Sequence, residues 1–432
     1  MAEIKPFRAW RYNDVLGNSI NELTAPLFDV VSDKQRKALY QNPLNSIHLS
    51  VPLGRVPATT AKETLELWKQ KGILQQDRLP AIYPYYQYFK LPGEKREFCR
   101  KGFICHVKAY DWSEGELLRH ENTIPESVND RIELLEKTLL HSSPTHGLYT
   151  DPFFELEQIM DETMHAPIYE TEDYQGVRDV LSVIQDAAAI RKFIEVVAKT
   201  KILLADGHHR YEGSLQYRKK MRAADPNYTG TEAYNYHLMY LTNTEADDLR
   251  ILPTHRLLSG INISVEELLS RLEPYFFILP KEDPFELNEV ISGKQWAFGL
   301  YIDGQAFKIR LKPEAHRLLG WDVPAPVKNL DLTVMHYFVL QEVLGIPFEA
   351  QRNSSNIKYV RNFTECISKV NSGEASIALI TNEVSMDQVK DVCYSGAIMP
   401  QKSTFFYPKV ICGFLFSSIQ PDEFESFYNP LV

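Results

Sequence analysis

The sequence contains little cysteine, and its cysteines are not arranged as in disulfide-stabilised or zinc-binding proteins. Only five of the 432 residues are cysteine, an odd number, and no two of them are spaced as Cys-x-x-Cys. They are scattered at Cys99, Cys105, Cys366, Cys393 and Cys412. This pattern argues against a disulfide framework and a thiolate zinc site, and it favours a reducing, cytoplasmic environment.

Long apolar runs and an excess of basic residues are also missing. The N-terminal residues MAEIKPFRAWRYN lack the apolar core of a signal peptide, and the apolar stretch VICGFLFSSI is too short to cross a bilayer. The 47 basic and 57 acidic side chains give a formal net charge of −10, which repels a polyanion such as DNA. We therefore expect no export, no membrane anchor and no nucleic-acid partner, while a local basic pocket for a small phosphate compound remains compatible with this charge.

The composition is that of a folded protein with more than one domain. Hydrophobic residues make up 44% of the chain, and its length corresponds to two or three domains of roughly 150 residues each. We find no internal repeat and no low-complexity linker. The best candidate for a domain boundary is the acidic, turn-like stretch NTEADD, residues 243–248. It divides the chain into a region 1–245 and a region 246–432.

Hydrophobic periodicity predicts a fold of mixed sheets and helices, in the α/β to α+β class. Strands are expected at residues 47–53, 202–205, 236–241 and 405–416. An aromatic hairpin is expected from 81–91 and 101–110, and a second hairpin from 296–302 and 306–311. Helices are expected at 132–140, 186–199, 211–223 and 387–394, and helix caps are expected at Thr60, Asp186 and Ser264.

The most informative stretch is ILLADGHHRYEGS, residues 202–214, where an apolar strand ends in a group of ionisable side chains. A glycine at this point, Gly207, lets the backbone turn tightly and lets a ligand approach it. The first N–H groups of the helix that follows attract an anion. The strand end is therefore a candidate phosphate site.

The ionisable side chains of this stretch suit phosphoryl transfer. Arg210 offers a forked cation to phosphate oxygens, while His208 and His209 can donate hydrogen bonds or move protons near neutral pH. Asp206 can orient an imidazole or bind Mg²⁺ that bridges phosphates. The alternative is a structural turn in which Asp206 caps the helix and Arg210 forms a surface ion pair. Adjacent histidines cannot both face one metal ion, which argues against a zinc site.

Three further loops carry candidate functional residues. His120 and Glu121, in the sequence HENT, place an imidazole and a carboxylate before a helix, where a general base could lie. The phosphate-binding candidates outside the glycine loop are Arg131, at the end of the polar stretch HENTIPESVNDR, Arg256, in LPTHR, and Lys402 and Ser403, in MPQKST. The alternative is that all three loops are ordinary capping and connecting segments.

Along nearly its whole length, the chain resembles the domain of unknown function 1015 family of bacteria and archaea. The matching segments occur in the same order and include APLFDVV at 25–31, HENT at 120–123, LLADGHHRYE at 203–212, LPTHRL at 252–257, LDLTVMH at 330–336 and MPQKSTFFYPK at 399–409. Asn122 departs from the family, which more often has arginine there. Asp29 and Glu121 are retained, so acid/base roles at these positions are preserved.

The resemblance extends to the nucleotide-binding loop of the ParB and sulfiredoxin superfamily, with the region 246–432 as an added α+β part. His208 stands where sulfiredoxin has its catalytic cysteine, which makes that reaction improbable. A branch similar to ADP-dependent free-serine kinases implies exchange of phosphate between serine and a nucleotide such as ADP, with Mg²⁺. It implies that Glu121, Asp29 or His120 acts in acid/base steps, and that Lys402 and Ser403 close over the phosphate.

Two alternatives to this kinase activity stay open. One is a phosphatase that acts on phosphoserine, and the other is a ParB-like nucleotide-binding switch without catalysis. The sequence also leaves a homodimer open.

Overall fold

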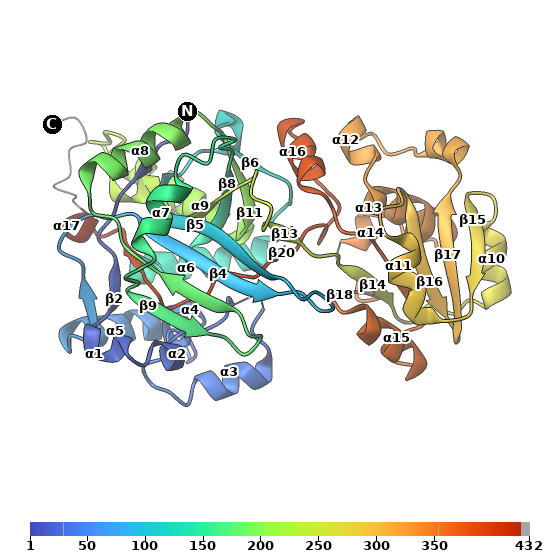
Figure 1. Ribbon diagram of the computed structural model, residues 1–432, viewed down its shortest axis with the longest axis horizontal. Coiled ribbons are helices and arrows are strands. Elements are labelled where there is room, and N and C mark those ends of the chain that lie inside the picture. The colour runs from blue at the N-terminus through green and yellow to red at the C-terminus, as the bar shows by residue number, and fades with distance from the viewer. Residues whose placement is uncertain (29, 353, 425–432) are drawn as a thin grey trace. The chain divides into compact units, whose positions relative to one another are not determined.

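The computed structural model describes residues 1–28, 30–352 and 354–424, which form two compact units. The first unit contains Met1–Arg119, Thr123–Leu249 and the segment that begins at Pro408. The second unit contains His120–Asn122 and Arg250–Tyr407 (Figure 1). The second unit is therefore an insertion in the sequence of the first, rather than a separate C-terminal half.

The first unit is built on a mixed nine-stranded sheet. Its strand order is β6 (Leu117–Arg119), β11 (Ile202–Asp206), β8 (Thr145–Tyr149), β12 (Tyr236–Asn243), β5 (Glu97–Lys108), β4 (Tyr83–Lys90), β10 (Arg178–Leu181) and β9 (Tyr169–Glu172), with β1 (Ile4–Lys5) added to β5. Strands β6 and β11 are parallel, as are β8 and β12, and the other pairs are antiparallel. The aromatic hairpin predicted from the sequence is confirmed as β4 and β5.

Helices of the first unit pack their apolar sides into its core. Helix α8 (Ala187–Ala198) buries Ile190, Phe193, Val196 and Val197, and the carboxylate of Asp186 accepts a hydrogen bond from Ala189 N, as its predicted cap role requires. Helix α6 (Pro125–Thr138) packs between α5 (Pro57–Gln70) and α9 (His208–Ala224). This packing fixes the position of α9, whose first turn carries the histidines.

The second unit has an antiparallel sheet of six strands. Their order is β15 (Phe276–Lys281), β17 (Gln305–Leu311), β16 (Ala297–Ile302), β19 (Ile377–Ile380), β14 (His255–Leu258) and β18 (Ile357–Val360). Its helices include α10 (Val265–Leu272), α11 (Leu287–Ile291), α15 (Phe363–Asn371) and α16 (Met386–Tyr394). The predicted hairpin β16–β17 is confirmed, and its turn residues Asp303 and Gly304 both have positive φ, as a tight two-residue turn requires.

Two of the predicted strands are wrong. Residues 47–53 contain a helix, α4 (Ile47–Ser50), because the Asn45 side chain accepts a hydrogen bond from Ile47 N and turns the chain. Within 405–416, only β20 (Phe406–Tyr407) is a strand, and single bridges join Cys412 to Ala25 and Phe416 to Trp10. The apolar residues at 410–416 lie in the core of the first unit. A buried loop can be as apolar as a buried strand, so the sequence pattern did not distinguish the two.

Mixed sheets with helices confirm the expected α/β to α+β class. No helix among the described residues combines the length and the apolar character needed to cross a membrane.

Candidate functional site

The strand end at Asp206 is followed directly by helix α9. Gly207 is the N-terminal cap residue, in the left-handed conformation with φ 88° and ψ 27°, and Tyr211 N donates the first helical hydrogen bond to its carbonyl over 3.0 Å. The helix begins at His208, three residues earlier than the sequence predicted. Both histidines and Arg210 therefore lie in the first turn, where backbone N–H groups have no acceptor within the helix.

Gly207 is required by its surroundings as well as by its backbone angles. A Cβ atom there would lie 2.6 Å from Cγ2 of Thr145 and 2.8 Å from Nη2 of Arg210. The space that a side chain would fill is thus occupied by the protein itself. This differs from the expectation that Gly207 leaves room for a ligand at that point.

Replacing Gly207 with alanine tests this double constraint. We expect Gly207→Ala to lower the free energy of unfolding of the first unit by about 2 kcal/mol, from left-handed strain plus the clash with Thr145. Gly93 is the matched control, since it has φ 84° with no atom within 4 Å of the added Cβ. Gly93→Ala should cost about 1 kcal/mol, from strain alone. Equal losses in urea unfolding would show that the close approach has no energetic effect.

The carboxylate of Asp206 is buried between two cations. Its Oδ1 lies 2.6 Å from Nζ of Lys409, and its Oδ2 lies 3.6 Å from Nη2 of Arg210. Burial alone would raise the pKa of Asp206, but the Lys409 ammonium and the Arg210 guanidinium hold it well below its usual range. The group carries a net excess of one positive charge, which suits an anion.

The guanidinium of Arg210 is hydrogen-bonded to the loop before β8. Its Nη1 donates to Oγ of Ser143 over 2.9 Å and to the carbonyl of Pro144 over 2.6 Å, and its side chain is only 9% exposed. Its Nε has no acceptor among the described residues. The ion pair of Arg210 is thus a buried one, unlike the surface pair that the alternative interpretation required.

A buried network of hydrogen bonds positions the backbone at Lys409. Gln87 Nε2 donates to the carbonyl of Lys409 over 2.9 Å, and Arg100 donates to the carbonyl of Pro408 and to the amide oxygen of Gln87. Gln87 Nε2 also donates to Asp179, and burial raises the pKa of the Asp179 carboxyl to about 7. Strands β4, β5 and β10 therefore fix the backbone that presents the Lys409 ammonium.

The two histidines of the motif lie in different surroundings. His209 Nε2 accepts a hydrogen bond from Ile124 N, the cap residue of α6, over 3.0 Å. That nitrogen therefore carries no proton in this arrangement, and His209 connects α9 to α6. The side chain of His208 is buried at 5% exposure.

Two further histidines, His237 and His146, form hydrogen bonds with residues close to Gly207. His237 contacts Oγ1 of Thr145 through Nε2 over 3.1 Å and Oγ of Ser214 through Nδ1 over 2.8 Å. His146 contacts Oγ1 of Thr242 over 2.8 Å. Burial lowers the pKa of both imidazoles, so they stay neutral and act as fixed hydrogen-bonding groups.

The donor set at Asp206 does not fit a magnesium ion. Both carboxylate oxygens face cations, and a hard divalent ion needs several oxygen ligands. No group of three or more His, Cys, Asp or Glu residues that could hold a metal occurs within the described ranges. We therefore derive no step through a metal bound by Asp206.

The other predicted site residues fall into two sets. Arg131 lies on α6 in the first unit, where its Nη1 donates to the carbonyl of Ser50 over 2.8 Å and its guanidinium covers the ring of Phe28. The remaining residues lie in the second unit: His120, Glu121, Arg256, Lys402 and Ser403. Asp29 lies outside the described residues.

The second set is brought together by the MPQKST segment. His120 Nε2 contacts Oγ1 of Thr404 over 2.7 Å, and the carbonyl of His120 accepts from Met399 N over 2.9 Å. Arg256 donates to the carbonyl of Gln401 over 3.2 Å. Segments that are far apart in the sequence thus meet within this unit.

Sequence reasoning missed several residues around Asp206. Lys409 is the last residue of the MPQKSTFFYPK match, so its charge could have been noticed, although its partner is 203 residues away. Ser143 and Thr145 lie in the stretch HSSPTHG, whose serines and proline indicate a loop but do not show which residues it contacts. Arg100 stands in a strand pattern and gives no signal of burial.

The family of the protein follows from comparison of its sequence. The profile of the family described as "Protein of unknown function (DUF1015)" matches residues 4–333, more than half of the chain, and the chain belongs to this family. No curated protein gives a significant match.

Solved structures show a remote likeness. A free serine kinase in complex with AMP is 12% identical, with a TM-score of 0.39, and the alignment covers 74% of this chain and 93% of that one. A variant of a free serine kinase in complex with ADP is 11% identical, with a TM-score of 0.38 and coverage of 78% and 98%. A conserved hypothetical protein from Pyrococcus furiosus is 12% identical, with a TM-score of 0.37 and coverage of 73% and 95%.

Proposed function

We propose that the protein is a phosphotransferase that exchanges a phosphate between a nucleotide such as ADP or AMP and serine or a similar small hydroxyl compound. The nucleotide binds at the Gly207 junction, the point where strand β11 ends at Asp206 and helix α9 begins at His208. The observation that carries the proposal is the buried Lys409–Asp206–Arg210 group at the start of a 17-residue helix. A net positive charge at the N-terminus of a helix is suited to phosphate oxygens. The ParB/sulfiredoxin-like character of the loop belongs to the same proposal.

The transfer exchanges one phosphate bond for another. A serine hydroxyl oxygen attacks the terminal phosphorus of ADP, a new P–O bond forms, and the bond to the bridging oxygen breaks to leave AMP and phosphoserine. The hydroxyl proton passes to a carboxylate, for which Glu121 and Asp29 are the candidates. Arg210 and the α9 N-terminus stabilise the charge on the transferred group, and Asp206 keeps the two cations in place. Concentrations set the direction, so the same site also runs towards serine.

The alternatives use the same junction differently. A phosphatase would replace the acceptor with water, and a nucleotide-dependent switch would bind without transfer. We also propose a cytoplasmic location, a Mg²⁺ requirement brought by the nucleotide, and a homodimer.

Incubation with phosphoserine separates these functions. Phosphoserine is supplied alone, with AMP and with ADP, each with and without Mg²⁺, and serine, phosphate and nucleotides are quantified. Loss that depends on AMP, with formation of ADP, supports transfer, whereas phosphate release without nucleotide indicates hydrolysis. No turnover in any mixture would exclude both reactions for this substrate. Salt-sensitive binding to duplex DNA without turnover would favour the switch.

A conservative change at Arg210 links any turnover to the junction. Arg210→Lys keeps the charge but loses the fork, and we expect kcat/KM to fall about 100-fold. Arg222→Lys is the matched control at the other end of α9, where the guanidinium binds Asn235 Oδ1. It should leave kcat/KM within about twofold. Equal effects of the two changes, measured per folded molecule, would remove Arg210 from the reaction.

A further inference from the structure

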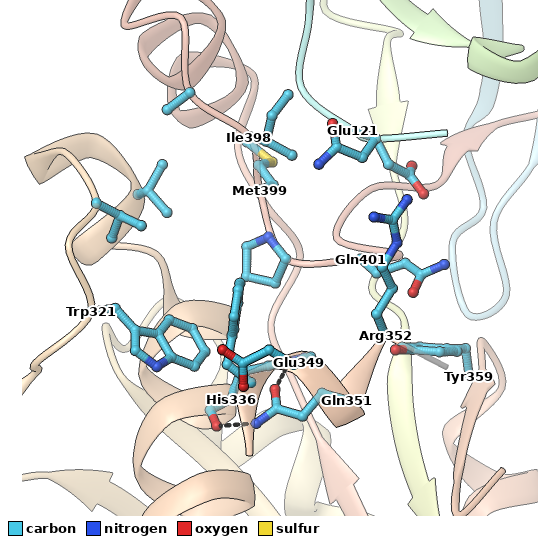
Figure 2. Close-up of a pocket in the computed structure, with 16 residues that line it drawn as sticks. Glu121, Trp321, His336, Glu349, Gln351, Arg352, Tyr359, Ile398, Met399 and Gln401 are labelled. Carbon is cyan, nitrogen blue, oxygen red and sulfur yellow. Dashed lines mark hydrogen bonds between the residues drawn. The ribbon is translucent and has the colours of Figure 1, made fainter. Parts of the chain in front are cut away.

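A pocket of about 490 Å³ lies in the second unit, and all the residues that line it belong to that unit (Figure 2). This volume corresponds to a small metabolite with a ring and one or two substituents. The junction at Gly207 in the first unit contributes nothing to its lining.

One side of the pocket is an aromatic wall that is fixed before any ligand arrives. The indole N–H of Trp321 donates to Oε1 of Gln341 over 3.0 Å. The Trp321 ring packs edge-on against Phe348 at 4.4 Å and against Tyr337 at 5.5 Å between centroids. Figure 2 shows Trp321 on one side of the pocket and Tyr359, Arg352 and Gln401 on the other. A held indole of this kind is a stacking surface for a flat ring.

The floor of the pocket presents a buried histidine in a defined tautomer. Gln351 Nε2 donates to the carbonyls of His336 and Ile346, so its Oε1 faces Nδ1 of His336 over 2.9 Å and accepts from it. The proton of His336 is therefore on Nδ1, and Nε2 is an acceptor without a partner among the described residues. His336 stands in a π-helical segment, η5 (Met335–Val343), a rare conformation that occurs often at functional sites.

The far side of the pocket contains polar atoms that the described chain leaves unsatisfied. The hydroxyl of Tyr359 and Oε1 of Gln401 are both buried without a hydrogen-bond partner there. Buried polar groups are normally paired, so the unpaired ones around this pocket are available to hydrogen-bond a ligand. They include both a donor and acceptors.

A buried cation lies directly behind Tyr359 and Gln401. The Arg256 side chain is 0% exposed, its guanidinium carbon lies 5.3 Å from the centroid of the Tyr359 ring, and it donates to the carbonyls of Thr254 and Gln401. No ion pair joins Arg256 to a carboxylate in the described part of the chain, and its Nε has no acceptor there. Two carboxylates, Glu121 and Glu349, line the pocket itself. Burial lowers the pKa of Arg256 to about 10. An uncompensated buried charge is costly, and a nearby anion would offset that cost.

We propose that this pocket binds a small organic anion with a flat ring, which places a carboxylate or phosphate towards Tyr359 and Arg256 and its ring against Trp321. A hydroxyl or amino group of the ligand donates to His336 Nε2. The proposal joins three sequence matches that the phosphate junction does not use for its own geometry: Arg256 in LPTHRL, His336 in LDLTVMH and Gln401 in MPQKST. It goes beyond the proposed function and does not depend on it.

Binding to the full-length protein tests the ligand class. Isothermal titration is made with AMP and indole-3-acetate, which combine a ring with an anion, and with adenosine and inorganic phosphate, which have one feature each. We expect at least one ring-bearing anion to bind about tenfold more tightly than adenosine or phosphate. AMP binding that is weakened by Trp321→Phe would identify the anion of this pocket as a phosphate ester, and binding of indole-3-acetate alone would identify it as a carboxylate. No binding by either, or equal binding by adenosine, would overturn the proposal.

Paired variants locate the binding in this pocket. Tyr359→Phe removes one unpaired hydroxyl and should weaken binding about tenfold, and Trp321→Phe should weaken it about fivefold. The controls Tyr394→Phe and Trp296→Phe change the same residue types in the second unit, outside the pocket lining, and should leave the affinity unchanged. Lys409→Gln should leave the binding of indole-3-acetate unchanged and should weaken only the AMP binding that belongs to the Gly207 junction. Loss in Lys409→Gln with no effect of Tyr359→Phe and Trp321→Phe would assign the binding to the Gly207 junction and overturn the proposal.

Discussion

Lowering the pH from 8 to 5 is expected to remove most of the stability of the first unit. Six buried histidines have a lowered pKa because burial penalises their charged form: His106, His141, His146 and His237 in the first unit, and His255 and His336 in the second. Their pKa values are about 4 for His141 and His255 and about 3 for His336. Unfolding exposes these imidazoles to water, where they bind protons near pH 6.5.

The sign of the effect follows from these directions. A depressed folded-state pKa means that the unfolded chain binds more protons, so the stabilising contribution is complete above about pH 6.5 and is lost as the pH falls. A histidine with a folded pKa near 4 removes roughly 2 kcal/mol at pH 5. The pKa values of His106, His146 and His237 are lowered in the same direction, so their losses add to that of His141 and together are comparable with the stability of a typical domain. The first unit should therefore unfold at less acidic pH than the second.

Urea unfolding at several pH values measures this proton uptake. A double variant, His106→Phe with Ser417→Ala, removes one imidazole and its hydrogen-bond partner, and the ring can stack on Phe7 as His106 does. The slope of unfolding free energy against pH should then fall by about one proton. A free energy of unfolding that stays constant from pH 8 to pH 5 would contradict the buried neutral state of these histidines.

Replacing Lys409 with methionine is expected to destabilise the first unit by about 3 kcal/mol at pH 7, because it leaves the buried Asp206 carboxylate without its hydrogen-bonded cation. The Arg210 guanidinium, at 3.6 Å, compensates only in part. Chemical unfolding of Lys409→Met against the unaltered protein gives the loss directly.

An exposed ion pair provides the control for Lys409→Met. Lys101 and Asp161 lie 2.7 Å apart, but their side chains are 34% and 48% exposed. Lys101→Met should therefore cost under about 1 kcal/mol. In a double-mutant cycle, Lys409→Met with Asp206→Asn should show a coupling energy of about 2 kcal/mol. Additive losses would mean that the two groups do not stabilise each other.

Local signals in the sequence were sufficient for elements whose hydrogen bonds lie close along the chain. The β4–β5 and β16–β17 hairpins and the Asp186 cap were predicted from patterns of a few residues. The strand predicted at residues 47–53 was wrong because a single buried helical turn and a buried strand both have an apolar sequence. The wrong start of α9 has a related cause: polar histidines at a helix N-terminus resemble a loop.

The candidate site was predictable only where one segment supplies it. Asp206, Gly207 and Arg210 are neighbours in the sequence, and their charges and glycine were recognised there. Lys409 joins them from 203 residues away. The pocket around His336 and Tyr359 depends on side chains whose types are ordinary in a core, so only their arrangement in space reveals it.

The return of the chain at Pro408 to the first unit affects the order in which the protein is completed. The ribosome makes Asp206 long before Lys409, and the second unit from Arg250 to Tyr407 is made between them. During that interval the carboxylate has Arg210 but not its closest cation, and the core lacks Val410, Cys412 and Phe414. The Gly207 junction is therefore completed only after translation of the whole insertion, and until then the charges of Asp206 and Arg210 cancel, without the excess positive charge that the finished group has.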